Sequence, residues 1–208
     1  MSAFSLIETM RYEPGQGILR RNLHGARLSN SARIFGFPGA DAALAALDDL
    51  AAAAASSLRL RLELFPDGRH EMTSAPFASL PEGKTWRARI ASNTRLSSSD
   101  PKLRHKTSDR ARYQAARAEY SPEEADEVLL TNEKGELCEG TITNLFVDEG
   151  HGRLLTPPLS SGCLAGVLRT SLICAKKARV AAIKPDDIAG RPFYLGNSLR
   201  GLIPAILA

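Results

Sequence analysis

The segment EVLLTNEKGELCEGTITNLFVDEGHGRLLTPPLSSGCLAGVLRT, residues 127–170, decides the fold. Its short apolar runs are broken by turn residues, which is typical of strands in a meander. We expect these strands at 128–130, 142–147 and 153–156. Pro157 and Pro158 end the third strand, and a loop of small residues leads through Gly166 into a segment with apolar residues at helical spacing. The sequence therefore predicts a meander, a loop and a helix.

The loop before that helix has the features of a phosphate site. A helix start offers free backbone N–H groups and the positive end of a dipole, and glycine lets a ligand approach closely. Glu139 and Gly140 add a carboxylate beside another close-approach position. Many loops contain glycine without binding anything, so spacing alone leaves a plain surface loop as the commoner alternative.

The residues themselves carry a more specific signal. Three stretches occur in a fixed order: EGTITNLF at 139–146, TPPLSSG at 156–162 and GVLR at 166–169. Together they resemble the central signature of the class IV aminotransferases, which are pyridoxal-phosphate enzymes of fold type IV. That family includes branched-chain and D-amino-acid transaminases and aminodeoxychorismate lyase. The resemblance extends to FSLIETMR at 4–11, to His24 with Arg27, and to NSLRG at 197–201, so it covers most of the chain.

The resemblance implies a two-domain fold of the α+β or α/β class. It implies a small N-terminal α/β sandwich at 1–98, which carries the phosphate-gripping Arg27. A C-terminal, barrel-like α/β domain at 102–208 is implied to carry the catalytic lysine, Glu139 and the phosphate loop. The polar stretch before Pro101 is the expected joint.

The residue pattern gives its own coarse structure for each part. In the first part, two helices are expected against a mostly antiparallel sheet, the first bearing Leu28 and closed by Gly36, the second capped by Asp41. Alternating residues predict strands there at 4–10, 58–64, 71–75 and 86–91. In the second part, helices are expected at 107–120 and from 121–124, with closing strands at 190–195 and 202–207.

Composition bounds the class of protein. The chain has 208 residues, 43% apolar and 24% charged, with a net charge of only +4. These values are ordinary for a globular protein, and no basic stripe points to nucleic acid. Three cysteines and four scattered histidines indicate reduced thiols and no metal site. We find no signal peptide or membrane span, and expect a cytoplasmic protein.

Pyridoxal-phosphate catalysis needs a lysine that forms a Schiff base with the cofactor, an acid at the pyridine nitrogen, and a grip on the phosphate. Seven lysines are available, and composition alone does not choose among them. The stretch DPKLRHKT at 100–107 resembles the family's catalytic segment, which implies that Lys106 is the Schiff-base lysine. An exposed loop lysine is the alternative.

The resemblance also implies the cofactor's other contacts. Glu139 is implied to face the pyridine nitrogen and Arg27 to grip the phosphate, with a hairpin glutamate and a surface arginine as the plain alternatives. The remaining implied cofactor residues are Thr143, Asn144, Val167, Leu168 and Ser198. Leu168 departs from many transaminases, which have Thr there, so one hydroxyl contact to the phosphate is expected to be missing.

Three functions stay open. Arg110, four residues after Lys106, favours a lyase that converts 4-amino-4-deoxychorismate to 4-aminobenzoate and pyruvate, since branched-chain transaminases tend to have Tyr there. Arg11 and Arg200 are further candidates for binding substrate carboxylates. A class IV aminotransferase acting on branched-chain or D-amino acids with 2-oxoglutarate is the first alternative. A non-catalytic homologue, trimmed of the family's initial hairpin, is the second. The resemblance implies a small amino substrate and a homodimer.

Overall fold

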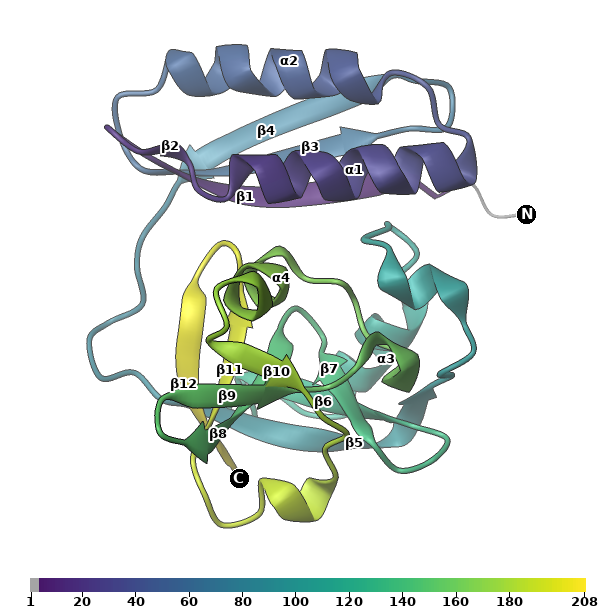
Figure 1. Cartoon of the computed structure of the whole chain (residues 1–208), viewed down its shortest axis with the longest axis vertical. Helices are drawn as coiled ribbons and strands as arrows, with labels where there is room; N and C mark the ends of the chain where they lie inside the picture. The colour runs from purple at the N-terminus through teal and green to yellow at the C-terminus, as the bar shows by residue number, and fades with distance from the viewer. Residues whose placement is uncertain (1–3) are drawn as a thin grey trace. The chain divides into compact units, whose positions relative to one another are not determined.

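The computed structural model describes residues 4–208, and the chain forms two compact units (Figure 1). The first unit contains the chain up to Ser79 together with His105–Asp109. The second contains Leu80–Arg104 and Arg110–Ala208. This division differs from the expected joint near residue 100, because the chain enters the second unit earlier and returns once to the first.

The first unit is a four-stranded antiparallel sheet covered on one face by two helices (Figure 1). Its strands lie in the order β2-β1-β3-β4. Their bounds are β1 Leu6–Glu13, β2 Gly17–Ile18, β3 Leu58–Leu64 and β4 His70–Pro76, and the helices are α1 Arg21–Phe35 and α2 Ala40–Ala52. The alternation of β3 buries Leu60, Leu62 and Leu64 in the core beneath the helices.

Both predicted helices of this unit are confirmed, but one cap is not. Gly36 ends α1 in the left-handed conformation, as expected. Asp41, predicted as the N-cap of α2, lies in the first turn, and Gly39 is the N-cap at φ 83°. The backbone explains this correction, because a Cβ at position 39 would lie 2.7 Å from the Gly68 carbonyl oxygen. Only glycine fits this close approach.

The segment His105–Asp109 adds to the edge of β1. Thr107 forms a bridge with Leu6, the N–H of Ile7 donates to the Lys106 carbonyl at 2.8 Å, and the N–H of Ser108 donates to the Ser5 carbonyl at 2.9 Å. The helix predicted at 107–120 therefore starts later, as α3 Ala111–Ala118. Extended pairing with β1 replaces the first predicted turn of that helix.

The second unit is built on one curved sheet of eight strands in the order β10-β9-β8-β11-β12-β5-β6-β7 (Figure 1). Its strands are β5 Trp86–Leu96, β6 Glu127–Asn132, β7 Leu137–Gly140, β8 Asn144–Gly150, β9 Arg153–Thr156, β10 Ala178–Val180, β11 Phe193–Asn197 and β12 Gly201–Leu207. The strand predicted at 86–91 was expected in the first sheet, but β5 pairs in parallel with β6 and β12. Alternation identifies a strand with one wet face and does not identify its partner.

Short helices complete this unit. They are α3, α4 Val167–Cys174 and the 3₁₀ turns η1 Pro101–Arg104, η2 Leu159–Ser161 and η3 Pro185–Asp187. No helix forms from 121–124, although Ser121 N–H does donate to the Glu124 carboxylate at 2.8 Å. One half of the predicted capping box is present, and it closes a turn.

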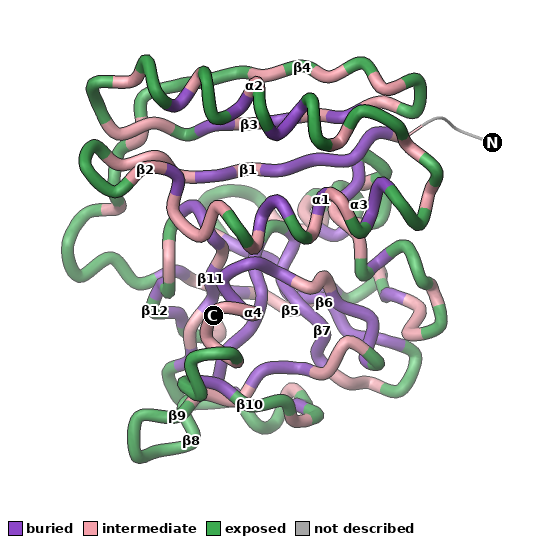
Figure 2. The backbone as a smooth tube through the Cα atoms, turned by 45° about the horizontal axis from the view of Figure 1, so that its top comes forward, coloured by how far each residue is buried: buried purple, intermediate pink, exposed green. Residues whose placement is uncertain are grey.

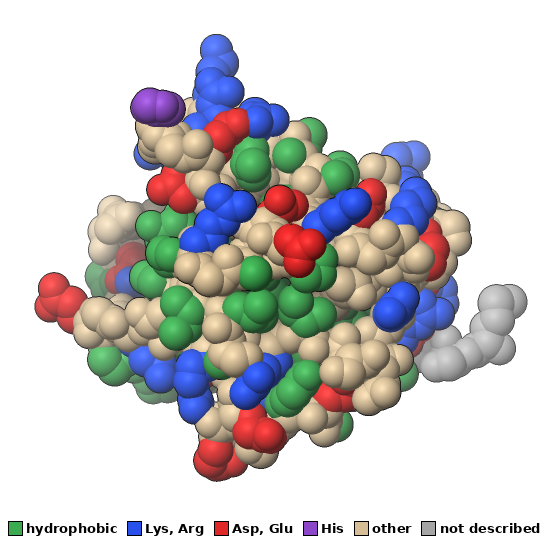
Figure 3. All heavy atoms as spheres, turned by 90° about the horizontal axis from the view of Figure 1, so that it is seen from below, with side chains coloured by type: hydrophobic (Ala, Val, Ile, Leu, Met, Phe, Trp, Pro, Cys, Tyr) green, Lys and Arg blue, Asp and Glu red, His purple; other side chains and the backbone are tan. Residues whose placement is uncertain are grey.

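The interior of the second unit is centred on its middle strands. Figure 2 shows β6 and β7 as continuously buried, and every residue of both strands is buried. Such strands carry their polar residues into the interior, where each needs a partner. In Figure 3, Lys and Arg side chains are interspersed with Asp and Glu over the face drawn. None of the helices within residues 4–208 combines the length and apolar character that crossing a membrane requires.

Candidate functional site

The Glu139 carboxylate, near the end of β7, is 4% exposed, and donors from several segments hold it. The Tyr113 hydroxyl donates to Oε1 at 2.7 Å. The Leu164 backbone N–H and the Asn144 side-chain amide donate to Oε2 at 3.1 and 3.3 Å. The donors come from α3, β8 and the loop before α4, so the carboxylate is fixed from three segments. Hydrogen bonds of this kind favour the charged form of a carboxylate.

Asn144 links this carboxylate to the loop that leads into α4. Its amide also donates to the Leu164 carbonyl at 3.1 Å. A Cβ at position 166 would lie 1.8 Å from the Asn144 Oδ1 atom, so Gly166 is required for this packing. Glu139, Asn144 and the start of α4 therefore form one connected structure.

The start of α4 suits an anion. Gly166 is its N-cap, no described side chain caps it, and its first turn holds no acidic residue. The first N–H groups of a helix and its dipole attract phosphate. Leu168 packs at Gly196, where a Cβ would lie 2.8 Å from the Leu168 side chain. This contact joins α4 to the strand that precedes the buried Ser198.

The residues of the second unit thus fit two parts of pyridoxal phosphate. A fixed carboxylate suits the ring nitrogen, and an uncapped helix start near a serine-bearing turn suits the phosphate. The predicted residues Glu139, Asn144, Val167 and Leu168 are brought into this structure. The predicted cofactor residue Thr143 instead contacts Glu127, to which its hydroxyl donates at 2.9 Å.

Glu127 lies beneath the turn that follows Glu139, and it is 1% exposed. Its carboxylate accepts from the backbone N–H groups of Val128, Thr141 and Ile142 at 2.9, 3.0 and 3.1 Å. The hydroxyl groups of Thr141 and Thr143 also donate to it, at 2.5 and 2.9 Å. A buried carboxylate with five donors fixes the course of the turn.

Replacing Glu127 by glutamine is expected to lower the free energy of unfolding by about 2–4 kcal/mol. The amide NH₂ group would face N–H and O–H groups that now donate to a carboxylate oxygen. The Thr143 hydroxyl can rotate to accept, but the Ile142 N–H cannot. Urea unfolding of this variant beside Glu123→Gln, an exposed neighbour, measures the loss. Equal stability of the two variants would contradict a role for Glu127 in holding the turn.

In the first unit, Arg27 lies in a buried ionic cluster with Glu8 and His24. Its Nε and Nη2 donate to the two oxygens of Glu8 at 2.7 and 2.6 Å. His24 Nδ1 lies 2.6 Å from Glu8 Oε2, and the His24 ring is fully buried. Arg27 and His24 are one helical turn apart on α1, while Glu8 lies on β1. Two-point pairing with Glu8 fixes the plane of the guanidinium that the sequence assigned to phosphate.

This cluster predicts a pH dependence of stability. Burial disfavours the Glu8 anion, but the Arg27 charge and the hydrogen bonds from His24 and Arg27 outweigh it and lower the pKa of Glu8 from 4.5 to about 2. The unfolded chain therefore binds the Glu8 proton first as the pH falls, so stability present above 4.5 is lost between 4.5 and about 2. Burial lowers the pKa of His24 and outweighs the opposite effect of Glu8. The folded chain therefore takes up the His24 proton less readily than the unfolded chain, and stability is also lost as the pH falls below 6.5.

The expected loss from Glu8 is about 3 kcal/mol over that window. Urea unfolding at a series of pH values measures it, and Glu8→Gln should flatten the curve between 4.5 and 2. A variant whose curve runs parallel to that of the original protein would contradict the assignment to Glu8.

Lys106 lies on the segment paired with β1, and its backbone carbonyl makes the bond to Ile7 described above. The preceding residue is tied to α1. His105 Nδ1 lies 2.8 Å from the Ser31 hydroxyl, and the His105 ring packs edge-on against Phe35 at 4.8 Å between centroids. The backbone of Lys106 is thereby fixed on both sides of the residue.

The arginines predicted to bind substrate are placed differently. Arg11 pairs with Glu13 and stacks 4.3 Å above the Phe77 ring. Arg110 donates to the Thr141 carbonyl and lies 4.7 Å above the Tyr113 ring. Arg200 is exposed at the turn before β12. Arg11 belongs to the first unit, and Arg110 and Arg200 belong to the second.

Sequence reasoning missed three residues of this structure. Tyr113 hydrogen-bonds to Glu139, and Glu127 accepts hydrogen bonds from the turn that follows Glu139. Glu8 forms the ion pair with Arg27. Glu8 and Glu127 each stand in a strand of otherwise apolar or alternating residues, which is the signal of a buried, partnered carboxylate. Tyr113 stood in a predicted helix, where a polar aromatic residue carries no such signal.

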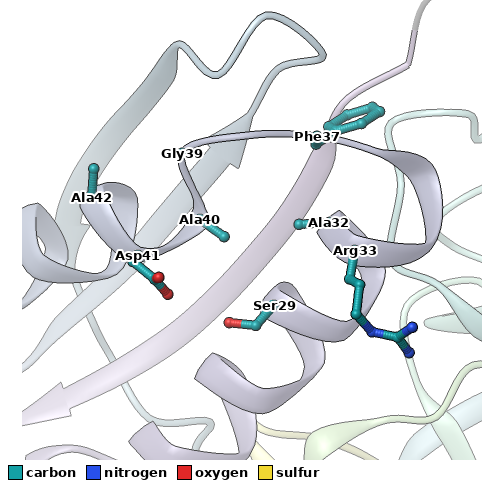
Figure 4. Close-up of a pocket in the computed structure, with 8 residues that line it drawn as sticks. All are labelled: Ser29, Ala32, Arg33, Phe37, Gly39, Ala40, Asp41 and Ala42. Atoms are coloured by element: carbon teal, nitrogen blue, oxygen red, sulfur yellow. The ribbon is translucent and has the colours of Figure 1, made fainter.

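A shallow depression in the first unit lies between the end of α1 and the start of α2 (Figure 4). It has a volume of about 500 Å³ and is lined by Ser29, Ala32, Arg33, Phe37, Gly39, Ala40, Asp41 and Ala42. The Arg33 guanidinium points away from Asp41 in Figure 4 and donates to Asn30 at 3.0 Å. The predicted site residues are absent from this lining, and its charged groups do not converge.

Comparison with known proteins gives one family. The family model for amino-transferase class IV matches residues 5–207. A solved structure of a Mesorhizobium loti protein, to which amino-acid aminotransferase activity is ascribed, is 47% identical and has a TM-score of 0.93. The match covers 99% of this chain and 100% of the Mesorhizobium loti chain.

Two curated relatives carry different names. A Thermotoga maritima protein, to which branched-chain-amino-acid aminotransferase activity is ascribed, is 30% identical over 74% of this chain and 57% of its own length. The aminodeoxychorismate lyase of Saccharomyces cerevisiae is 35% identical over 35% of this chain and 19% of its own. The chain thus spans little more than half the length of the first relative.

Proposed function

The chain belongs to the class IV aminotransferases, and from that premise we propose that it is a lyase that converts 4-amino-4-deoxychorismate to 4-aminobenzoate and pyruvate. Membership makes it an enzyme of a pyridoxal-phosphate-dependent family. The observation that carries the choice of reaction is Arg110, which stands four residues after Lys106. The lyases of the family tend to have arginine at this position.

In the proposed mechanism, pyridoxal phosphate, when bound, would supply an electron sink for the substrate carbon that bears the amino group. The Lys106 amine removes the proton from that carbon as a general base. The enolpyruvyl group leaves with the electron pair of its C–O bond and takes up a proton to become pyruvate. The products contain every atom of the substrate, so the reaction needs no second substrate.

The other residues bind and orient. Glu139, held by Tyr113, Asn144 and Leu164, presents a negative charge that favours a protonated ring nitrogen. The N–H groups of Val167 and Leu168, the Ser198 hydroxyl and the Arg27 guanidinium are proposed to bind the phosphate. Leu168 offers no hydroxyl, so this phosphate contact relies on the backbone.

A transamination is the second candidate, favoured by the names of the Mesorhizobium and Thermotoga relatives. Here Lys106 would take the same proton, and a 2-oxo acid would be needed to complete the cycle. The two functions therefore differ in their need for a second substrate.

The deciding experiment follows from that difference. The purified protein is incubated with pyridoxal phosphate and 4-amino-4-deoxychorismate, without any 2-oxo acid, and 4-aminobenzoate is measured by its fluorescence. A parallel incubation contains branched-chain or D-amino acids with 2-oxoglutarate, and glutamate is measured. Release of 4-aminobenzoate supports the proposed lyase activity. Formation of glutamate without 4-aminobenzoate would contradict that proposal and support the aminotransferase. A homodimer is part of the proposal, and light scattering should give twice the mass of the chain.

A further inference from the structure

Tyr113 has no place in the proposed mechanism, yet it donates to the carboxylate on which that mechanism depends. Its hydroxyl lies 2.7 Å from Glu139 Oε1, whereas Leu164 and Asn144 both donate to Oε2. A carboxylate held through one oxygen can still swing about that oxygen. The bond from Tyr113 holds the other oxygen, Oε1, and so restricts this rotation.

The Tyr113 ring is itself held in place. It packs against the buried cluster that contains Ala116, and the Arg110 guanidinium lies 4.7 Å above it. Arg110 also donates to the Thr141 carbonyl, two residues beyond Glu139. Tyr113 and Arg110, one turn apart at the start of α3, therefore hold the β7–β8 turn at two points.

The protonation state of Tyr113 suits a permanent donor. Burial raises the pKa of the Tyr113 hydroxyl above its ordinary value, and the charge of Glu139 and the hydrogen bond to it raise it further. The hydroxyl keeps its proton throughout the neutral range. It therefore always has a proton to donate to Glu139.

We propose that Tyr113 is a positioning residue that fixes the Glu139 carboxylate against the ring nitrogen of pyridoxal phosphate. The inference rests on the proposed function in needing that cofactor, but not on the choice between lyase and aminotransferase. Tyr113 acts through Glu139, so its removal should change cofactor binding and the titration of the bound cofactor only while Glu139 keeps its charge.

The test compares Tyr113→Phe with Tyr120→Phe. Tyr120 packs against the same cluster, and its hydroxyl donates to the Ile90 carbonyl at 2.9 Å, so the control loses an equivalent bond. Pyridoxal phosphate is titrated into each cofactor-free protein, and the visible absorbance of the bound cofactor is followed with pH. We expect Tyr113→Phe to raise the Kd about tenfold and to move the pH midpoint, while Tyr120→Phe changes neither.

A double-mutant cycle separates positioning from folding. In a Glu139→Gln background, Tyr113→Phe should change the Kd by less than about twofold, since the charged partner is gone. An unchanged effect in that background, or no effect in the original protein, overturns the inference and leaves the proposed function standing. Failure of the unmodified protein to bind pyridoxal phosphate overturns the proposed function itself.

Discussion

Replacing Lys106 by alanine is expected to lower kcat by on the order of a thousandfold or more, because the proposed general base for the substrate proton is removed. The same change should abolish covalent attachment of pyridoxal phosphate after borohydride reduction, since the proposed amine is absent. Stability should be nearly unaffected. The segment around Lys106 is held to β1 by backbone atoms, which alanine retains.

Turnover, peptide mapping of the reduced protein and thermal unfolding measure these three outcomes. Lys134→Ala is the control, because Lys134 is exposed in the turn between β6 and β7. Borohydride labelling of Lys134, or a Lys106→Ala protein with ordinary turnover, would remove Lys106 from the mechanism. A loss of stability alone would assign Lys106 to the fold.

Replacing Glu139 by glutamine should lower kcat/KM by about a hundred- to a thousandfold, as removal of a fixed charge from a reacting centre does. The surroundings tolerate the amide. Its oxygen can take the place of Oε2, facing the Leu164 N–H and the Asn144 amide, and its NH₂ group then meets the Tyr113 hydroxyl, which can turn to accept. The lost activity would therefore report the lost charge.

Steady-state kinetics and the Kd for pyridoxal phosphate check this expectation, with Glu82→Gln as an exposed control. The defect should lie in kcat as well as in cofactor affinity, and saturating cofactor should not restore it. Full recovery of activity at high pyridoxal phosphate would show that Glu139 binds the cofactor without tuning it.

The sequence predicted strands near β6, β8 and β9 and the helix after Gly166 because their signals are local, but it missed β7 and β10. Turn residues mark the ends of the meander, and the helix after Gly166 is confirmed as α4. The motif at 139–146 placed Glu139 and Asn144 together, and they lie within hydrogen-bonding distance. Such features depend on residues that lie close together along the chain, as within the motif at 139–146.

Features that depend on distant partners were missed or misplaced. Strand β5 has the alternation of a strand with one wet face, which does not show that it lies between β6 and β12 in the second sheet. Tyr113 reaches Glu139 across 26 positions of sequence, with no periodic pattern connecting the two. The pairing of Arg27 with Glu8 is likewise a tertiary contact, which side-chain type alone does not disclose.

The return of the chain at His105–Asp109 has a consequence for synthesis on the ribosome. No fragment that ends at Ser79 contains a complete first unit, because the segment His105–Asp109, which pairs with the edge of β1, is translated only after β5. The exposed edge of a nascent sheet invites pairing with other chains. Final closure of the first unit must therefore wait for the residues that carry Lys106, the lysine proposed here as the catalytic base.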